Sequence, residues 1–115
     1  LGTSSIVIRV DEAFLLWNSI SPHMPKTARF TTGSRIENHF LDLLEYIYQA
    51  YYAHQQKKSE LLTQSILKND IITFLIQTSW EAKLITNQHY GQMNDLLTEI
   101  GKMLGGWKKG IDMKL

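Results

Sequence analysis

Cysteine is absent from the 115 residues, and no apolar run approaches the length of a membrane span. Without cysteine the chain has no disulfide, no thiolate zinc site and no cysteine nucleophile. A membrane-spanning helix needs about 20 consecutive apolar residues, and the sequence has no such run. No secretory signal is visible at the start of the chain either. These absences predict a protein of the cytoplasm that has no contact with a membrane.

The chain also lacks an excess of either charge, because 12 basic residues are balanced by 11 acidic ones and leave a net charge of +1. A nucleic-acid-binding domain usually has a pI above about 9, so whole-molecule charge gives little reason to expect one. Basic residues nevertheless gather in two groups, one at the head of the second predicted helix and one near the end of the last. Taken alone, such groups are typical of solvated helix ends. The two groups are Lys26, Arg29 and Arg35, and Lys102, Lys108 and Lys109.

Proline occurs only twice, as Pro22 and Pro25, which end a first helix and make a turn. The start of that helix has an alternative, since the β-branched run Ile6-Val7-Ile8 is also typical of an extended segment. Between Ser34 and Lys58 there is neither proline nor glycine, and apolar residues recur at steps of three and four. This spacing predicts a long amphipathic helix whose stripe other helices must cover. The stripe consists of Ile36, Phe40, Leu43, Ile47 and Tyr51.

The remaining segments also have the pattern of amphipathic helices, separated by short connections. The sequence therefore predicts one all-α domain, an antiparallel up-and-down four-helix bundle. The predicted domain is 1–115, with helices at roughly 6–21, 26–57, 59–84 and 87–109. The expected core stripe of the third helix is Leu62, Ile66, Ile71, Phe74, Leu75 and Thr78. That of the fourth is Met93, Leu97, Ile100, Leu104 and Trp107.

The second helix has two possible starts. Ser34 and Glu37 form a capping box, which indicates a start at Ser34. Pro25 before a run of helix-tolerant residues indicates a start near Lys26, with Gly33 inside the helix. We favour the earlier start. The expected N-caps of the third and fourth helices are Ser59 and Thr86.

No group of side chains has the spacing of a catalytic or metal site. The histidines are too far apart in sequence to share a helical turn, and no Glu-x-x-His pair occurs. The sequence also has no nucleophile elbow and no phosphate-binding loop. We therefore expect no enzyme activity, no metal, no cofactor and no small-molecule substrate. The four histidines are His23, His39, His54 and His89.

Tyrosines crowd the second half of the long helix and point around more than one side of it. A single bundle core accepts one stripe of them, so the others are exposed or buried against another chain. Tyrosine is enriched in interfaces because its ring is apolar and its hydroxyl tolerates water. We favour an oligomer over a monomer, the alternative being ordinary surface tyrosines beside a core. The expected interface residues are Tyr48, Tyr51, Tyr52 and Trp107.

Two motifs in the chain resemble those of a known family. Residues 25–33 read PKTARFTTG, and residues 99–107 read EIGKMLGGW. Together and in this order, they resemble motifs of the accessory variability determinant proteins of diversity-generating retroelements, in a match from about Trp17 to Lys109. These proteins belong to a broader four-helix-bundle family, which includes proteins encoded by intervening sequences of bacterial 23S ribosomal RNA genes.

The resemblance implies a bundle that assembles into a homopentameric barrel and has no catalytic activity. It also implies a role in mutagenic retrohoming beside the element's reverse transcriptase, which copies a template RNA with errors at adenines. The accessory protein is implied to bind that polymerase and nucleic acid, RNA or cDNA, through a basic surface. Carried onto this chain, the surface would consist of the two basic groups, joined into one patch if Pro25 and Trp107 lie side by side. Its candidate residues are Lys26, Arg29, Arg35, Lys102, Lys108 and Lys109.

One departure from the family pattern follows Asp70. Family members often carry Arg three and seven residues after the matching aspartate, where this chain has Thr73 and Gln77. The two missing cations agree with the low net charge. They support a second hypothesis, in which the chain is a structural four-helix-bundle scaffold that binds protein partners and not nucleic acid.

Overall fold

Four helical rods joined by short turns make up residues 4–115, the part of the chain that the computed structural model describes. No strand occurs in this range, so the all-α prediction is confirmed. None of the helices in it is long and apolar enough to cross a membrane. The elements are α1 (Ser5–Ile20), η1 (Ser21–His23), α2 (Lys26–Ala28), η2 (Arg29–Gly33), α3 (Ser34–Tyr52), α4 (Gln55–Glu81) and α5 (Asn87–Asp112).

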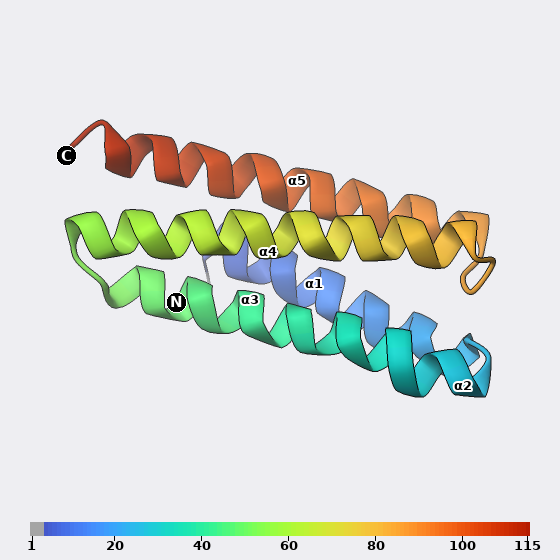
Figure 1. The fold of residues 1–115 in the computed structure, drawn as a ribbon. Coiled ribbons are helices and arrows are strands. Elements are labelled where there is room, and N and C mark those ends of the chain that lie inside the picture. Colours follow the sequence, from blue (N-terminus) through green and yellow to red (C-terminus); the bar gives the residue numbers. More distant parts are fainter. Residues whose placement is uncertain (1–3) are drawn as a thin grey trace.

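Successive rods run antiparallel, and α2, η2 and α3 together form the second rod (Figure 1). α4 packs between α3 and α5, and α1 packs on the same two helices from the opposite corner of the bundle. The molecule measures 46 × 23 × 21 Å. Different helices and turns form its two ends. The α2 end holds η1, α2 and the α4–α5 turn, and the C-terminal end holds the α3–α4 turn and the last turn of α5.

The core lies where the apolar stripes of the rods meet. On α3 and α5 the spacing of three and four residues predicts the buried positions well, because nearly every apolar residue on these stripes is fully covered. Tyr51 and Trp107, at the ends of the two stripes, are only half-buried. The fully covered residues are Ile36, Phe40, Leu43 and Ile47 on α3, and Met93, Leu97, Ile100 and Leu104 on α5.

On α4 the buried face differs from the predicted one. Phe74 is 66% exposed and Thr78 lies on the surface, so their assignment to the core stripe is wrong. Ile71 is only half-buried, whereas Leu62 is buried as expected. Apolar residues occur on every side of this helix, so their spacing does not single out one face. The residues that α4 buries are Ser59, Leu61, Leu62, Ser65, Asn69, Ile72, Ile76 and Ser79.

Small polar residues occupy the buried face of α4 because internal hydrogen bonds satisfy most of their polar atoms. The hydroxyls of Ser65 and Ser79 each donate, at 2.8 Å, to a backbone carbonyl one turn earlier. Asn69 Nδ2 donates to the backbone oxygen of Leu97 at 3.0 Å and so ties α4 to α5. Buried polar groups that find such partners are compatible with a core. Hydrophobic periodicity cannot reveal them, which is the physical reason for the wrong prediction.

The second rod begins at Lys26, the earlier of the two starts, and Gly33 lies inside it. Ser34 does not cap a helix, because Gly33 before it already has helical dihedral angles. The Ser34 hydroxyl instead donates to the backbone oxygen of Arg29 at 3.4 Å. The indole Nε1 of the buried Trp17 donates to the backbone oxygen of Gly33 at 3.2 Å. This bond joins α1 to the π-helical turn, a kind of turn that often occurs at functional sites.

The break between the second and third rods lies at Ala53 and His54, earlier than the predicted boundary at residues 57–59. His54 is extended, and Gln55 has a φ of 41°, so the chain reverses without proline or glycine. Ser59 is therefore not an N-cap. It lies inside α4, where its buried hydroxyl donates to Asp112 Oδ1 at 2.5 Å.

The α4–α5 turn contains Lys83, whose φ of 62° is in the left-handed region. Thr86 then caps α5, since its hydroxyl oxygen accepts a hydrogen bond of 3.0 Å from the backbone N–H of His89. The predicted N-cap at Thr86 is confirmed.

Candidate nucleic-acid and partner interface

The two basic groups lie at opposite ends of the bundle. Pro25 opens the second rod at the α2 end, whereas Trp107 lies towards the C-terminal end of α5 (Figure 1). The Trp107 ring packs against Tyr51, near the end of α3, with the ring centroids 5.0 Å apart. The expectation that Pro25 and Trp107 lie side by side is therefore wrong. In a four-rod antiparallel chain, the start of the second rod and the end of the fourth point to opposite ends.

The α2 end combines cations with an exposed aromatic ring. The guanidinium of Arg29 lies 4.8 Å from the centroid of the Phe30 ring, and one of its N–H groups donates to Pro22 O at 3.4 Å. Phe30 is 63% exposed, which leaves its ring accessible to a partner. Lys26 lies one turn before Arg29 on the same rod. Among the described residues, neither Arg29 nor Lys26 has a carboxylate close enough for an ion pair, so both charges are available.

Arg35 lies in the first turn of α3, beside α4. With Thr31, Thr32 and Leu75 it lines a shallow cleft of about 440 Å³. Like the other two cations of its group, Arg35 has no ion pair within residues 4–115. The three cations thus extend along the second rod from the α2 end rather than forming a single point of charge.

Sequence reasoning missed further residues at the α2 end. Lys83 in the α4–α5 turn joins His23 and His89 around a cleft of about 320 Å³, of which Pro25 also forms part. The antiparallel topology predicts this meeting, because the turn after the third rod returns to the end where the second rod begins. A fourth cation and two imidazoles therefore line a cleft with Pro25, the residue before Lys26.

At the C-terminal end, one of the three candidate cations is already neutralised. Lys108 forms an ion pair with Asp112, at 2.5 Å. Hydrogen bonds from Lys108 and from Ser59 lower the pKa of Asp112 below its usual range. Lys102 and Lys109 are exposed, and neither has an ion pair in the described part of the chain. The structure thus leaves this group with less available charge than the α2 end.

The four aromatic residues expected at an oligomer interface fall into two pairs. Tyr48 and Tyr52 are exposed on α3, with ring centroids 5.1 Å apart. Tyr51 and Trp107 are half-buried and pack on each other within the subunit, and the Tyr51 hydroxyl bonds to the Ser4 hydroxyl. Only the first pair presents most of its surface to a neighbouring chain.

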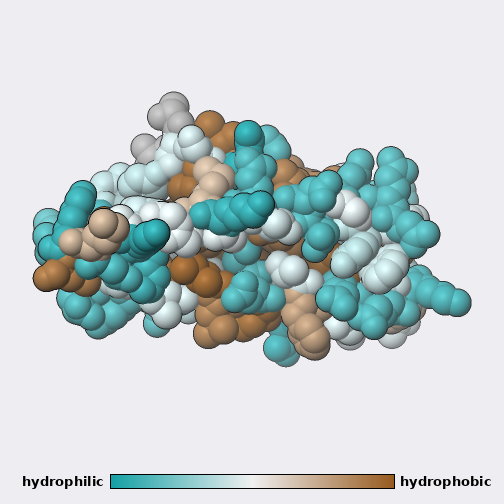
Figure 2. Space-filling view, turned by 90° about the horizontal axis from the view of Figure 1, so that it is seen from above, coloured by the Kyte–Doolittle hydropathy of each residue, from teal (hydrophilic) through white to brown (hydrophobic). Residues whose placement is uncertain are grey.

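Two further apolar faces are exposed on opposite corners of the bundle. On α4, Leu67 is 59% exposed and shares an outward stripe with Ile71 and Phe74, at steps of four and three. On α1, Ile8 and Leu15 are exposed seven residues apart. Seen from above, hydrophobic side chains emerge along the edge where α4 lies and along the edge where α1 lies, on either side of a largely hydrophilic α5 (Figure 2).

A half-buried cluster of charged and titratable groups joins α3 to α4. Lys68 Nζ lies 3.0 Å from His39 Nδ1 and 3.4 Å from Asp42 Oδ2. Burial lowers the pKa of His39 below its ordinary value of 6.5, and the charges of Lys68 and Arg35 lower it further, while Asp42 acts in the opposite direction.

The His39 cluster predicts that the protein loses stability in mildly acidic solution. Because the pKa of His39 is lower in the folded than in the unfolded state, the unfolded chain binds the proton first as the pH falls. The contribution of His39 to the free energy of unfolding is therefore complete above about pH 6.5, and it declines as the pH falls from there towards the lowered pKa. We expect the melting temperature to fall between about pH 7.5 and about pH 5.5, and to fall less in His39→Gln. An equal fall in His39→Gln and in the neighbouring control Asn38→Gln would contradict the assignment.

Within residues 4–115, no three side chains of the metal-ligating types come together. The described residues thus form a small antiparallel helical bundle with unpaired cations at one end and exposed apolar faces on two corners. A family model described as bAvd-like matches residues 8–111, and the chain belongs to this family of accessory variability determinants. The resemblance noted in the sequence is thereby confirmed, and the family is one of accessory proteins rather than of enzymes. No curated protein and no solved structure matches the chain significantly.

Proposed function

We propose that this protein is a non-catalytic accessory factor of a diversity-generating retroelement. In this role it binds the element's reverse transcriptase together with template RNA or cDNA during mutagenic retrohoming, in the cytoplasm. The observation that carries the proposal is the bAvd-like family match over residues 8–111, most of the chain.

The α2 end supports the nucleic-acid part of the proposal. Lys26, Arg29, Arg35 and Lys83 supply cations that no carboxylate of residues 4–115 pairs with. Phosphate contacts from such side chains provide most sequence-independent affinity for nucleic acid. The exposed ring of Phe30, next to Arg29, also suits the stacking of an unpaired base. In this proposal the α2 end is the main nucleic-acid surface, and Lys102, Lys108 and Lys109 are secondary contacts at the other end.

The two apolar corners support assembly into a closed ring, for which we propose the pentamer of the family. The stripe on α4 and the face of α1 that carries Ile8 and Leu15 differ in composition. They lie on opposite sides of the bundle, since α1 and α4 both pack on α3 and α5. Contacts between two different faces of identical chains are head-to-tail, and they close into a ring when the rotation allows it. A ring of five would repeat the α2 end five times, so that several weak phosphate contacts act together on one polyanion.

A titration of structured RNA at two salt concentrations tests the nucleic-acid proposal. We expect binding at about 50 mM salt that weakens steeply by about 200 mM, because phosphate contacts release counterions. The second hypothesis, a scaffold that binds only protein partners, predicts no binding at either concentration. The neutral Thr73 and Gln77 and the net charge of +1 are the observations that favour it.

A further inference from the structure

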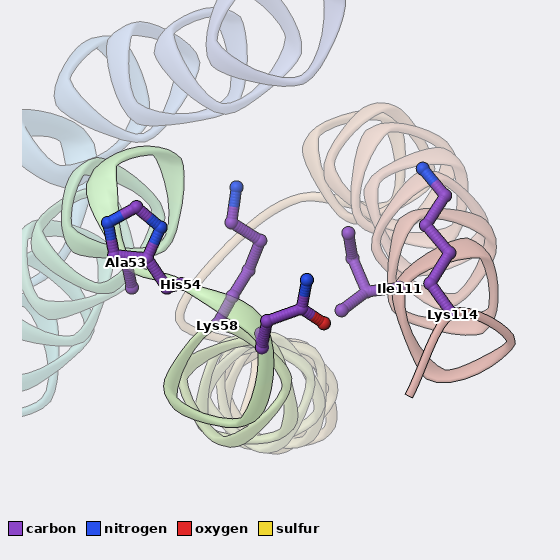
Figure 3. A pocket seen from close by; sticks show the side chains of 6 residues that line it. Ala53, His54, Lys58, Ile111 and Lys114 are labelled. Carbon is purple, nitrogen blue, oxygen red and sulfur yellow. The ribbon is translucent and has the colours of Figure 1, made fainter.

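A cleft of about 200 Å³ lies at the C-terminal end of the bundle, away from the basic α2 end. Ala53, His54 and Lys58 approach it from the α3–α4 turn and the first turn of α4, and Ile111 and Lys114 from the end of α5 (Figure 3). Gln55 completes the lining. Among these six residues there is no carboxylate, while two are lysines, one is a histidine and one has an amide group.

Lys58 has no anionic partner in the described structure. Its half-buried ammonium group meets only the backbone oxygen of Tyr51, at 3.5 Å, the outer limit of a hydrogen bond. The carboxylates nearby are engaged by other lysines. Glu60 pairs with Lys57 at 4.0 Å, and Asp112 pairs with Lys108. The cleft therefore keeps an excess of positive charge that its surroundings do not neutralise.

Gln55 adds an amide donor at a position where the backbone does not favour it. Its φ of 41° lies in the left-handed region, which glycine adopts at much lower cost than a residue with a side chain. Such strained positions are often found where a side chain serves a function. The first turn of α4 also contains no acidic residue, so the positive end of its helix dipole adds to the charge of the lysines.

We propose that this cleft binds a phosphate group. Ammonium groups, an imidazole and an amide are donors that match the oxygens of a phosphate, and charge-assisted bonds of this kind are the strong ones. Ala53 and Ile111 supply the apolar part of the lining. The phosphate belongs either to a nucleic-acid backbone or to a free phosphate or nucleotide. The site stands on its own residues and does not depend on the function proposed above.

Thermal unfolding in inorganic phosphate, compared with chloride at equal ionic strength, tests the site. A ligand that binds only the folded state raises the melting temperature, and we expect a rise of about 3 °C at a concentration well above the dissociation constant. Phosphate also stabilises proteins generally through exclusion from their surface. For each protein, the rise is therefore its melting temperature in phosphate minus its melting temperature in chloride, so that any change in intrinsic stability cancels. The difference in this rise between two variants is the effect of specific phosphate binding.

The double variant Lys58→Met and Lys114→Met is expected to lose the specific part of the rise. The double variant Lys102→Met and Lys109→Met is the matched control, because it removes the same charge from two exposed residues that do not line the cleft. An equal rise in all three proteins would overturn the proposal.

A single-stranded oligonucleotide titration distinguishes the two sources of phosphate. If the double variant of Lys58 and Lys114 binds the oligonucleotide more weakly, the site accepts a nucleic-acid backbone. If it binds the oligonucleotide as before but is no longer stabilised by inorganic phosphate, the site accepts a free phosphate or nucleotide.

Discussion

Replacing Lys26, Arg29 and Arg35 together by glutamine is expected to lower RNA affinity about 100-fold at low salt. Each neutralised phosphate contact removes close to one unit from the slope of log affinity against log salt, so the slope should fall by about 2–3. Glutamine has nearly the helix propensity of lysine and arginine. Lys26 and Arg35 are exposed, and Arg29 is half-buried without an ion pair among the described residues, so the bundle should fold normally. Fluorescence anisotropy with a labelled structured RNA over a series of salt concentrations measures both quantities.

The matched control is the triple glutamine variant of Lys102, Lys108 and Lys109, which removes the same charge from the other end of the bundle. We expect a smaller loss of affinity, because Asp112 already neutralises Lys108. A larger loss in this variant than in the first would contradict the assignment of the α2 end as the main nucleic-acid surface. Phe30→Leu separates stacking from charge, since it should weaken binding without changing the salt slope.

Introducing charge on the outward stripe of α4 is expected to dissociate the pentameric ring that we propose. Leu67→Glu with Phe74→Glu would place two unpaired carboxylates per subunit in a desolvated contact, which costs several kcal/mol at each interface. Both side chains are more than half exposed in the single subunit. The helical content should therefore stay unchanged while the mass falls from about five chains to one, as light scattering after size exclusion would show.

The control for this variant is Gln92→Glu with Thr98→Glu, which adds the same charge to the exposed, hydrophilic side of α5. This protein should keep the mass of the unmodified one. If the α4 variant also keeps the mass of the unmodified protein, the α4 stripe is not a subunit contact. If the unmodified protein is itself a monomer, the proposed ring is wrong.

The sequence predicts the fold well wherever one physical signal dominates. The strict steps from Met93 to Leu104 identify the buried face of α5, and Thr86 before them identifies its cap. On α4 the prediction fails because Ser65 and Asn69 enter the core through hydrogen bonds, which leaves Phe74 outside. Local patterns do not contain this information, since it depends on which carbonyl of another residue or helix a side chain meets.

The sequence likewise identifies some residues of the candidate surfaces but not which residues lie next to them. Lys26 and Arg29 are recognisable from the motif that contains them, but their neighbours depend on the direction of each rod. The antiparallel topology brings Lys83 to the cleft at Pro25 and takes Trp107 to the far end, although we expected Pro25 and Trp107 to lie side by side. The cleft at Lys58 depends on the reversal at Gln55, a left-handed position that no glycine marks.

A three-component mixture tests most directly whether this chain joins a reverse transcriptase to nucleic acid, as we propose. The purified protein, the reverse transcriptase of the same retroelement and its template RNA would be combined and separated by size exclusion with mass detection. We expect one complex that contains all three components. The triple variant of Lys26, Arg29 and Arg35 should lose the RNA from this complex but keep the polymerase. Separate elution of this protein from both partners at low salt would contradict the proposal.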